Sequence, residues 1–262
     1  MRFVPLDPPG TWCQNRALLE RLASFEGRRF LEVGCGDGSI SRVLCSRGYS
    51  GVGVDFSPTS LEAARRNLEP FVGASRYEVV ASDFWDYAPP KPAFDLVFSM
   101  LVVEHIADDE AFVRKMAACV RPGGLVLVAV PGRRDCWGLE DETVGHLRRY
   151  DRSDLENLLV AAGLVNVGIW SVAVPTANVL RRLGNFLIAR SRERAKLGRD
   201  SLEQTKESGV RDIPFKTTFP PIFRLVLNRW TMWPFGVLQR LFYRTELGVT
   251  LLGWGQSVGA ER

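Results

Sequence analysis

Short apolar runs alternate along this chain with longer segments whose apolar residues recur every three or four positions. The short runs predict β-strands, and they lie at residues 28–33, 51–54, 77–80, 94–99 and 125–130. Residues 39–47 and 58–68 each place their apolar side chains on one face and predict helices. Alternation of strand and helix predicts an α/β fold, a doubly wound parallel sheet covered by helices on both faces.

The pattern continues towards both ends of the chain. Residues 11–26 predict an opening helix, and the capping-box pattern at Ser153 predicts the start of another. A strand is predicted over 164–174 and a last strand near 247–256. About seventy residues separate these two strands, and connections of that length are seldom structureless in compact domains. We therefore predict a helical insertion over residues 176–245.

The composition is that of an ordinary globular protein, with 46% hydrophobic and 24% charged residues. No apolar run approaches the length that spans a bilayer, and the N-terminus lacks the apolar core of a signal peptide. The five cysteines form no C-x-x-C pair, which predicts reduced thiols. Together these features predict a cytoplasmic protein.

Charge is distributed unevenly between the insertion and the rest of the chain. Residues 176–245 hold fourteen Lys or Arg and five Asp or Glu, and the remainder is acidic. Within the insertion, residues 213–244 interleave tryptophan and phenylalanine with arginine. Three structures suit this pattern: an extra helical layer with buried aromatics, a lid over a substrate pocket, or a peripheral contact with an anionic membrane at its inner face. Nucleic acid is a disfavoured partner for the basic helix.

The turn after the first strand carries the strongest chemical signal. Residues 31–38 have the sequence L-E-V-G-C-G-D-G, and the next strand ends at Asp55. Glycines at alternate positions allow a sharp turn and a close approach to a ligand, and an acid at a strand tip accepts hydrogen bonds from ribose hydroxyls. Ser39 replaces the last glycine of a dinucleotide fingerprint, and Glu32 suits a cationic ligand.

These residues resemble motif I of the class I S-adenosylmethionine-dependent methyltransferases, of the small-molecule or lipid type that includes the methyltransferase type 11 and quinone-precursor O-methyltransferase group. The resemblance covers residues 28–174. It implies a Rossmann-like sheet of seven strands whose last strand is antiparallel. It also implies three parts: a helical segment over the cofactor site, the methyltransferase domain and the insertion. Their ranges are 1–27, 28–175 with 246–262, and 176–245.

The resemblance implies S-adenosylmethionine as cofactor and S-adenosylhomocysteine as product. It places the glycine loop under the methionine part, Glu32 near the ammonium and Asp55 on the ribose. Asp83 would meet the adenine amino group, with aromatic residues beside the ring. The implied cofactor-binding residues are Glu32, Gly34, Cys35, Gly36, Gly38, Asp55, Phe56, Asp83, Phe84 and Met100.

The strand over 94–99 leads into Glu104 and His105, at the strand end that faces the reaction centre in the family. The quinone-precursor enzymes carry E-x-x-E-H here and bind a divalent metal. This chain has Leu101 in place of the first glutamate. Hard cations need more oxygen ligands than remain, so we predict no metal. A three-ligand remnant with His146 is the alternative. His105 either orients the loop or takes part in catalysis, and Glu104 beside it is a candidate catalytic residue.

Residues 145–150 resemble a G-H-x-R-x-Y segment of methyltransferases that act on glycans, lipids and natural products. His146 has the intrinsic pKa of a base near neutral pH, and we predict it as the general base with Tyr150 as a supporting hydrogen-bond donor. In the alternative, Arg149 and Tyr150 pin the loop onto the helix over 153–162.

The predicted function is methyl transfer, to an oxygen of a small-molecule, glycan-linked or lipid-like acceptor. A nucleic-acid methyltransferase that uses the basic insertion is one alternative. It is disfavoured because no N/D-P-P-Y/F tetrapeptide follows the strand over 94–99. A module that binds S-adenosylmethionine without chemistry is the other alternative.

Overall fold

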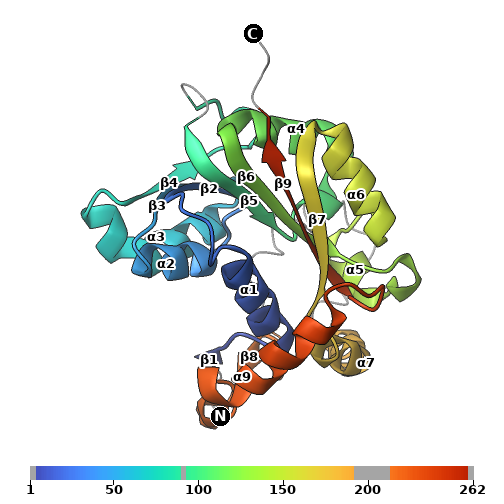
Figure 1. The fold of residues 1–262 in the computed structure, drawn as a ribbon. Coiled ribbons are helices and arrows are strands. Elements are labelled where there is room, and N and C mark those ends of the chain that lie inside the picture. The colour runs from blue at the N-terminus through green and yellow to red at the C-terminus, as the bar shows by residue number, and fades with distance from the viewer. Residues whose placement is uncertain (1–3, 90–92, 192–212, 259–262) are drawn as a thin grey trace. The chain divides into compact units, whose positions relative to one another are not determined.

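The computed structural model describes residues 4–89, 93–191 and 213–258 (Figure 1). Two compact units divide the chain, and each contains segments that are distant in sequence. The cofactor-loop unit comprises residues 26–130, 153–168 and 253–262, and the insertion unit comprises residues 1–25, 131–152 and 169–252.

A seven-stranded sheet forms the frame of the fold, in the order β4-β3-β2-β5-β6-β9-β7. Its strands are β2 (Arg29–Val33), β3 (Ser50–Asp55), β4 (Tyr77–Ala81), β5 (Phe94–Met100), β6 (Val120–Pro131), β7 (Leu164–Val172) and β9 (Thr250–Ser257). Strand β9 is antiparallel, while the pairs between β4 and β6 are parallel. This Rossmann-like order confirms the predicted fold class.

Register brings the carboxyl ends of the central strands to one edge of the sheet. Val33 at the end of β2 pairs with Val54 in β3 and Ser99 in β5. Met100 at the end of β5 pairs with Ala129 in β6. Loops that leave these strands therefore begin at the same level, which is where doubly wound folds bind ligands.

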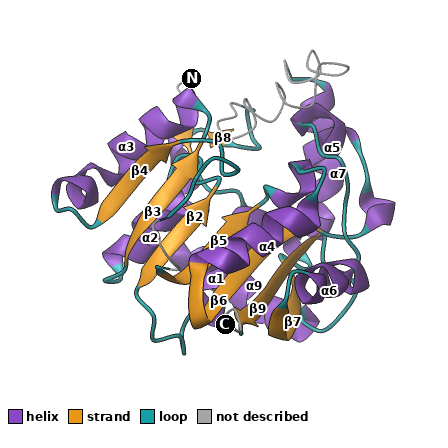
Figure 2. Cartoon of the chain, turned by 90° about the horizontal axis from the view of Figure 1, so that it is seen from above, coloured by secondary structure: helices purple, strands orange, loops and turns teal. Residues whose placement is uncertain are grey.

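Aromatic residues fill the core of the cofactor-loop unit. The ring of Phe30 lies 5.8 Å from that of Phe98 and 6.0 Å from that of Tyr77, measured between centroids. The main helices of this unit are α2 (Ser39–Ser46), α3 (Pro58–Gly73), α4 (Asp109–Cys119) and α6 (Arg152–Ala161), and Figure 2 shows α3 beside β4. Helix α3 runs five residues beyond its predicted end. Pro70 does not end it, because this proline lies near the last turn, where one backbone hydrogen bond is lost without breaking the helix.

The insertion unit combines the N-terminal residues with most of the predicted insertion. Its elements are β1 (Val4–Pro5), α1 (Pro9–Arg21), η2 (Arg134–Cys136), α5 (Leu139–Val144), α7 (Thr176–Ala189), β8 (Thr218–Phe219), η4 (Pro221–Leu225), α9 (Arg229–Leu238) and η5 (Gln239–Phe242). The short strands β1 and β8 pair antiparallel, a contact that no local pattern predicts. The basic residues between 192 and 212 lie outside the described residues.

Gln239 ties the opening helix to the insertion. Its fully buried side chain donates to the Cys13 carbonyl at 3.1 Å and accepts from the Ala173 amide at 3.0 Å. Nearby, a Cβ on Gly236 would lie 2.2 Å from Cδ of Arg16, so α1 and α9 approach closely. The structure thus places the first 25 residues with the insertion. The prediction that residues 1–27 cover the cofactor site, like the domain ranges, stays a prediction.

The structure also bears on two predictions from composition. All five cysteines are buried and free of disulfide bonds, as the absence of C-x-x-C pairing predicted. Among the described residues, none of the helices has both the length and the hydropathy needed to cross a bilayer.

Candidate functional site

The three glycines of the turn after β2 have different physical roles. All three have positive φ values, +71° at Gly34, +54° at Gly36 and +72° at Gly38. A Cβ on Gly34 would lie 2.5 Å from Val102, and one on Gly38 would lie 2.3 Å from Leu68. A Cβ on Gly36 would meet nothing within 4 Å. The outer glycines are therefore required by packing, while the middle one leaves open space for a ligand.

Asp55 ties the glycine loop to the end of β3. One carboxylate oxygen accepts a hydrogen bond from the Gly36 amide at 2.8 Å, and the other accepts from the Ser57 amide at 2.9 Å. The side chain is buried. A carboxylate has about four acceptor positions, so Asp55 keeps the capacity to accept from two ribose hydroxyls. Its geometry fits the role that the sequence predicted.

Glu32 is a buried carboxyl group at the end of β2. It accepts a hydrogen bond from the Ser41 hydroxyl. Burial raises the pKa of Glu32 to about 8; the nearby Asp37 and Asp55 charges act in the same direction, and the Ser41 hydrogen bond opposes them. Glu32 is therefore largely protonated at neutral pH. A ligand ammonium group would supply the counter-charge that favours its ionised form.

Cys35 contributes through its main chain. Its amide donates to the Val54 carbonyl at 3.2 Å. Burial raises the pKa of the Cys35 thiol, and the charges of Glu32 and Asp55 raise it further, so the thiol stays neutral and unreactive. The open cradle, the buried acid and the strand-tip aspartate together fit S-adenosylmethionine, which carries an ammonium group and a ribose.

The predicted adenine-contacting residues differ in exposure. Asp83 is exposed, and one of its oxygens accepts from the Trp85 amide at 2.9 Å. Phe56 is also exposed. Phe84 is buried instead, with its ring in edge contact with Phe112 of α4 at 5.1 Å. The binding roles of these three residues stay predictions.

A strained turn follows β5. Met100 is partly exposed, and Leu101 after it has a φ of +58°, which is unfavourable for a bulky side chain. The Leu101 amide donates to the Ala129 carbonyl at 2.8 Å, which holds the strained conformation. The turn brings Val102 against Gly34. Sequence reasoning treated Leu101 only as a missing glutamate, and no sequence signal marks its backbone role.

The residues that follow form the short helix η1 (Val103–His105). Glu104 is fully buried and His105 is half-buried. The His105 amide donates to the Val102 carbonyl at 2.9 Å, which closes the turn. The catalytic roles of these two residues stay predictions.

In the insertion unit, His146 is held by a buried aspartate. Its Nδ1 lies 2.7 Å from Oδ1 of Asp141, which is fully buried. Asp141 also accepts from Nε of Arg149 at 2.8 Å and from the Gly138 amide at 2.9 Å. Burial tends to raise the pKa of Asp141, but the hydrogen bonds and charge from His146 and Arg149 outweigh it and lower that pKa. Asp141 is therefore ionised and can orient the imidazole ring.

Sequence reasoning missed Asp141, although a signal was present. Gly145, with a φ of +77°, ends α5 and turns the chain back. His146 can then donate its amide to the Asp141 carbonyl at 3.0 Å. The glycine between the acid and the histidine is the pattern that could have revealed the pair.

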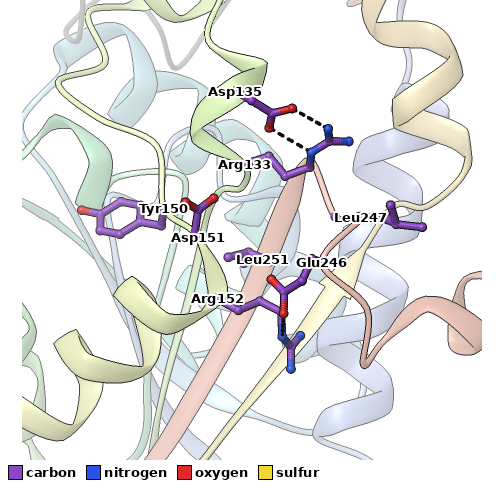
Figure 3. Close-up of a pocket in the computed structure, with 9 residues that line it drawn as sticks. Arg133, Asp135, Tyr150, Asp151, Arg152, Glu246, Leu247 and Leu251 are labelled. Atoms are coloured by element: carbon purple, nitrogen blue, oxygen red, sulfur yellow. Dashed lines mark hydrogen bonds and ion pairs between the residues drawn. The ribbon is translucent and has the colours of Figure 1, made fainter.

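In the alternative interpretation, Arg149 pins this loop onto the helix over 153–162. The contacts that Arg149 makes in the structure are different ones. Arg149 contacts Asp141 and donates from Nη1 to the Gly132 carbonyl at 2.9 Å. Tyr150 is buried, and its main chain pairs with Pro131 and Arg133 at the end of β6. In Figure 3 the Tyr150 hydroxyl points away from the ion pairs Arg133–Asp135 and Arg152–Glu246. Its supporting role in catalysis stays a prediction.

Comparison with models of known protein families identifies the family of this chain. Residues 10–169, more than half of its length, match a family model described as a methyltransferase domain. The chain belongs to this methyltransferase family. It contains a class I S-adenosylmethionine-dependent methyltransferase domain, as the motifs predicted, and S-adenosylmethionine is the cofactor of such domains.

Two ubiquinone biosynthesis O-methyltransferases are among its relatives. The one from Mesorhizobium japonicum is 38% identical over 109 residues, and the one from Rhodopseudomonas palustris is 34% identical over 112 residues. The match with Mesorhizobium covers 42% of this chain and 43% of the relative, and that with Rhodopseudomonas covers 43% of each. The matched segment thus spans less than half of these relatives.

Solved structures share the fold over most of the chain. Phosphoethanolamine N-methyltransferase 2 of Haemonchus contortus, solved with S-adenosylmethionine, has a TM-score of 0.59 at 20% identity. It covers 96% of this methyltransferase and 54% of its own chain. A Haloferax volcanii methyltransferase solved with an activator protein has a TM-score of 0.56 at 21% identity, and covers 94% of this chain and 90% of its own.

Proposed function

We propose that this methyltransferase methylates an oxygen of a small-molecule acceptor, with His146 as the general base. The observation that carries the proposal is the Asp141–His146 contact of 2.7 Å. A hydroxyl acceptor must lose its proton as it attacks, and a histidine held by an ionised carboxylate is suited to take that proton. The O-methyltransferase names of two relatives support oxygen as the acceptor atom.

Bound S-adenosylmethionine supplies an electrophilic methyl group. Around it, the open position at Gly36 admits the ligand, Asp55 accepts from the ribose, and Glu32 faces the ammonium. His146 accepts the acceptor proton while the new carbon–oxygen bond forms, and S-adenosylhomocysteine leaves with a neutral sulfur. Asp141 stabilises the resulting imidazolium. Much of the rate arises from alignment of the two reactants, because methyl transfer is an in-line displacement.

The experiment uses S-adenosylmethionine with a radioactive methyl group. The protein is incubated with an extract of its source cells, and the organic, aqueous and nucleic-acid fractions are counted. Label in a small-molecule fraction that disappears with His146→Asn, while S-adenosylhomocysteine binding is retained, is the expected result. Label in the nucleic-acid fraction, or full activity of His146→Asn, would contradict the proposal. Organic-phase label would identify an apolar acceptor.

We also propose that residues 213–244 make a peripheral contact with an anionic membrane. Aromatic and aliphatic side chains on η4, α9 and η5 face solvent, and Trp230 and Leu241 are 75% and 76% exposed. Met232 on the same helix is buried and anchors it. Residues 213–249 carry five basic residues and one acidic residue. Exposed indole rings beside cationic side chains are suited to the headgroup region of an anionic bilayer.

Sedimentation with vesicles tests the membrane proposal. Vesicles of phosphatidylcholine with about one-third phosphatidylglycerol should pellet the protein, whereas pure phosphatidylcholine should pellet much less. Trp230→Ser and Leu241→Ser should each reduce binding. Val160→Ser is the matched control, because Val160 is an exposed apolar residue on α6. Absence of binding to the anionic vesicles would refute the contact.

A further inference from the structure

A cavity in the insertion unit has no role in methyl transfer as proposed above. Its volume is about 410 Å³, and it lies beyond the end of β6. Its charged lining comprises two arginines, Arg133 and Arg152, and three carboxylates, Asp135, Asp151 and Glu246, and two leucines, Leu247 and Leu251, add apolar surface (Figure 3). Asp151 accepts a hydrogen bond from the Arg134 amide at 3.2 Å. None of these seven lining residues was predicted as a site residue from the sequence, whereas Tyr150, which also lines the cavity, was predicted as a supporting donor.

Two ion pairs flank the cavity. Arg133 donates from Nε and Nη2 to the two Asp135 oxygens at 3.1 and 2.6 Å. Nε of Arg152 lies 3.2 Å from Oε1 of Glu246. The arginine side chains are 31% and 21% exposed, whereas their carboxylate partners are 66% and 73% exposed. Both cations are therefore recessed, and both anions lie on the solvent side.

Because the carboxylates of the two ion pairs are more exposed than the arginines, another anion can take their place. An ion pair with a solvent-exposed carboxylate contributes little to stability. An incoming carboxylate or phosphate can accept the paired hydrogen bonds of Arg133 and the single Nε contact of Arg152, so the exchange leaves neither guanidinium without an anionic partner. The Arg152 side chain is fixed for such a contact because its Nη1 also donates to the Tyr243 carbonyl at 3.1 Å.

The backbone beneath Arg133 is rigid and strained. Arg133 has a φ of +64°, which is uncommon for a residue other than glycine. Its amide donates to the Tyr150 carbonyl at 2.9 Å, and the Gly132 amide donates to Val249 at 2.9 Å. A Cβ on Gly132 would lie 2.3 Å from the Gly248 carbonyl oxygen, so the two backbone segments pack closely at this point. Strain that the surroundings enforce in this way is typical of binding sites.

We propose that Arg133 and Arg152 bind a small organic anion, a carboxylate or phosphate group on an apolar body. The anion replaces Asp135 and Glu246 at the two guanidinium groups. Leu251, which is almost fully buried, and the more exposed Leu247 contact the apolar part. Binding at this cavity does not depend on methyl transfer, so the inference stands apart from the proposed acceptor chemistry.

Isothermal titration calorimetry with benzoate and phenyl phosphate tests the proposal, with inorganic phosphate as a third probe. Arg133→Gln and Arg152→Gln should each weaken binding by about tenfold or more, because each removes a charged hydrogen-bond donor to the anion. Asp135→Asn and Glu246→Gln should tighten binding several-fold, because each removes a competing anion. Arg66→Gln is the control, since Arg66 forms a comparable exposed ion pair with Glu62 on α3.

The Arg66→Gln control separates the site from general charge attraction, because a change of net charge alone would weaken binding equally in all three arginine variants. Benzoate binding tighter than phenyl phosphate binding identifies a carboxylate ligand, and the reverse order identifies a phosphate ester. Equal loss in all three arginine variants would overturn the proposal. So would the absence of binding of every probe at millimolar concentration, or weaker binding to Glu246→Gln. If an arginine variant fails to fold, the exposed Asp135→Asn and Glu246→Gln variants decide the question.

Discussion

Replacement of Glu32 by glutamine should stabilise the protein without cofactor and weaken cofactor binding. The Glu32 side chain is 3% exposed, and burial raises its pKa from 4.5 to about 8. Glutamine has nearly the same shape and keeps an oxygen that can accept from the Ser41 hydroxyl. It cannot ionise, so it removes the cost of a buried carboxylate together with the charge that would pair with a ligand ammonium.

The sign and size of the stability effect follow from proton linkage. Between pH 4.5 and about 8, folded Glu32 holds a proton that the unfolded chain has lost. The wild-type free energy of unfolding therefore falls as pH rises through this window, because the unfolded state binds fewer protons. From pH 5 to pH 7 the loss that arises from Glu32 is about 2–3 kcal/mol, at 1.36 kcal/mol per unit. Glu32→Gln does not lose this part of the free energy of unfolding, because glutamine does not titrate.

Urea denaturation of both proteins at pH 5, 6, 7 and 8 measures the difference. The stability advantage of Glu32→Gln should grow by about 2–3 kcal/mol between pH 5 and pH 7. Glu62→Gln removes an exposed carboxylate on α3 and should change stability by less than about 0.5 kcal/mol. A difference that is constant across this pH range, or a variant less stable than wild type at pH 7, would refute the reasoning.

Calorimetry with S-adenosylhomocysteine completes this test. Wild-type affinity should rise as pH increases from 6 towards 8, because binding of the ammonium requires Glu32 to lose its proton. Glu32→Gln should bind more weakly and show a flatter pH dependence. Equal affinities at pH 8 would remove Glu32 from the cofactor site while leaving the stability result intact.

Three further predictions follow from the site. Gly36→Ala should lose S-adenosylhomocysteine affinity, and Gly38→Ala should lower the melting temperature more than Gly36→Ala does, because both positions have positive φ but only the Cβ on Gly38 meets a side chain, Leu68, at 2.3 Å. Asp141→Asn should lower kcat by about 10²- to 10⁴-fold with little change in cofactor affinity, since it removes the acceptor that orients His146; unchanged kcat would count against it. Turnover should persist in EDTA, because Leu101 replaces an oxygen ligand; loss of activity that Mg²⁺ restores would reverse the prediction that no metal is bound.

The sequence by itself determined the sheet and the cofactor loop. Both depend on local rules: buried parallel strands are short apolar runs, and a turn that needs positive φ at Gly34, Gly36 and Gly38 selects glycine. Element ends were less well determined. The opening helix ends at Arg21 rather than near 26, and α6 begins at Arg152, just before its capping-box serine. Competing local hydrogen bonds settle such ends.

Only the tertiary structure decided burial, and burial decided the chemistry. The pKa of Glu32 rises because neighbouring segments exclude water from it, and no spacing along the chain encodes that exclusion. Asp141 meets His146 and Arg149 because a left-handed glycine reverses the chain. Trp230 follows the same apolar pattern as core residues but lies on the surface, since Met232 takes the buried face of the helix. Periodicity marks where apolar residues recur, whereas contacts between distant segments determine which of them meet water.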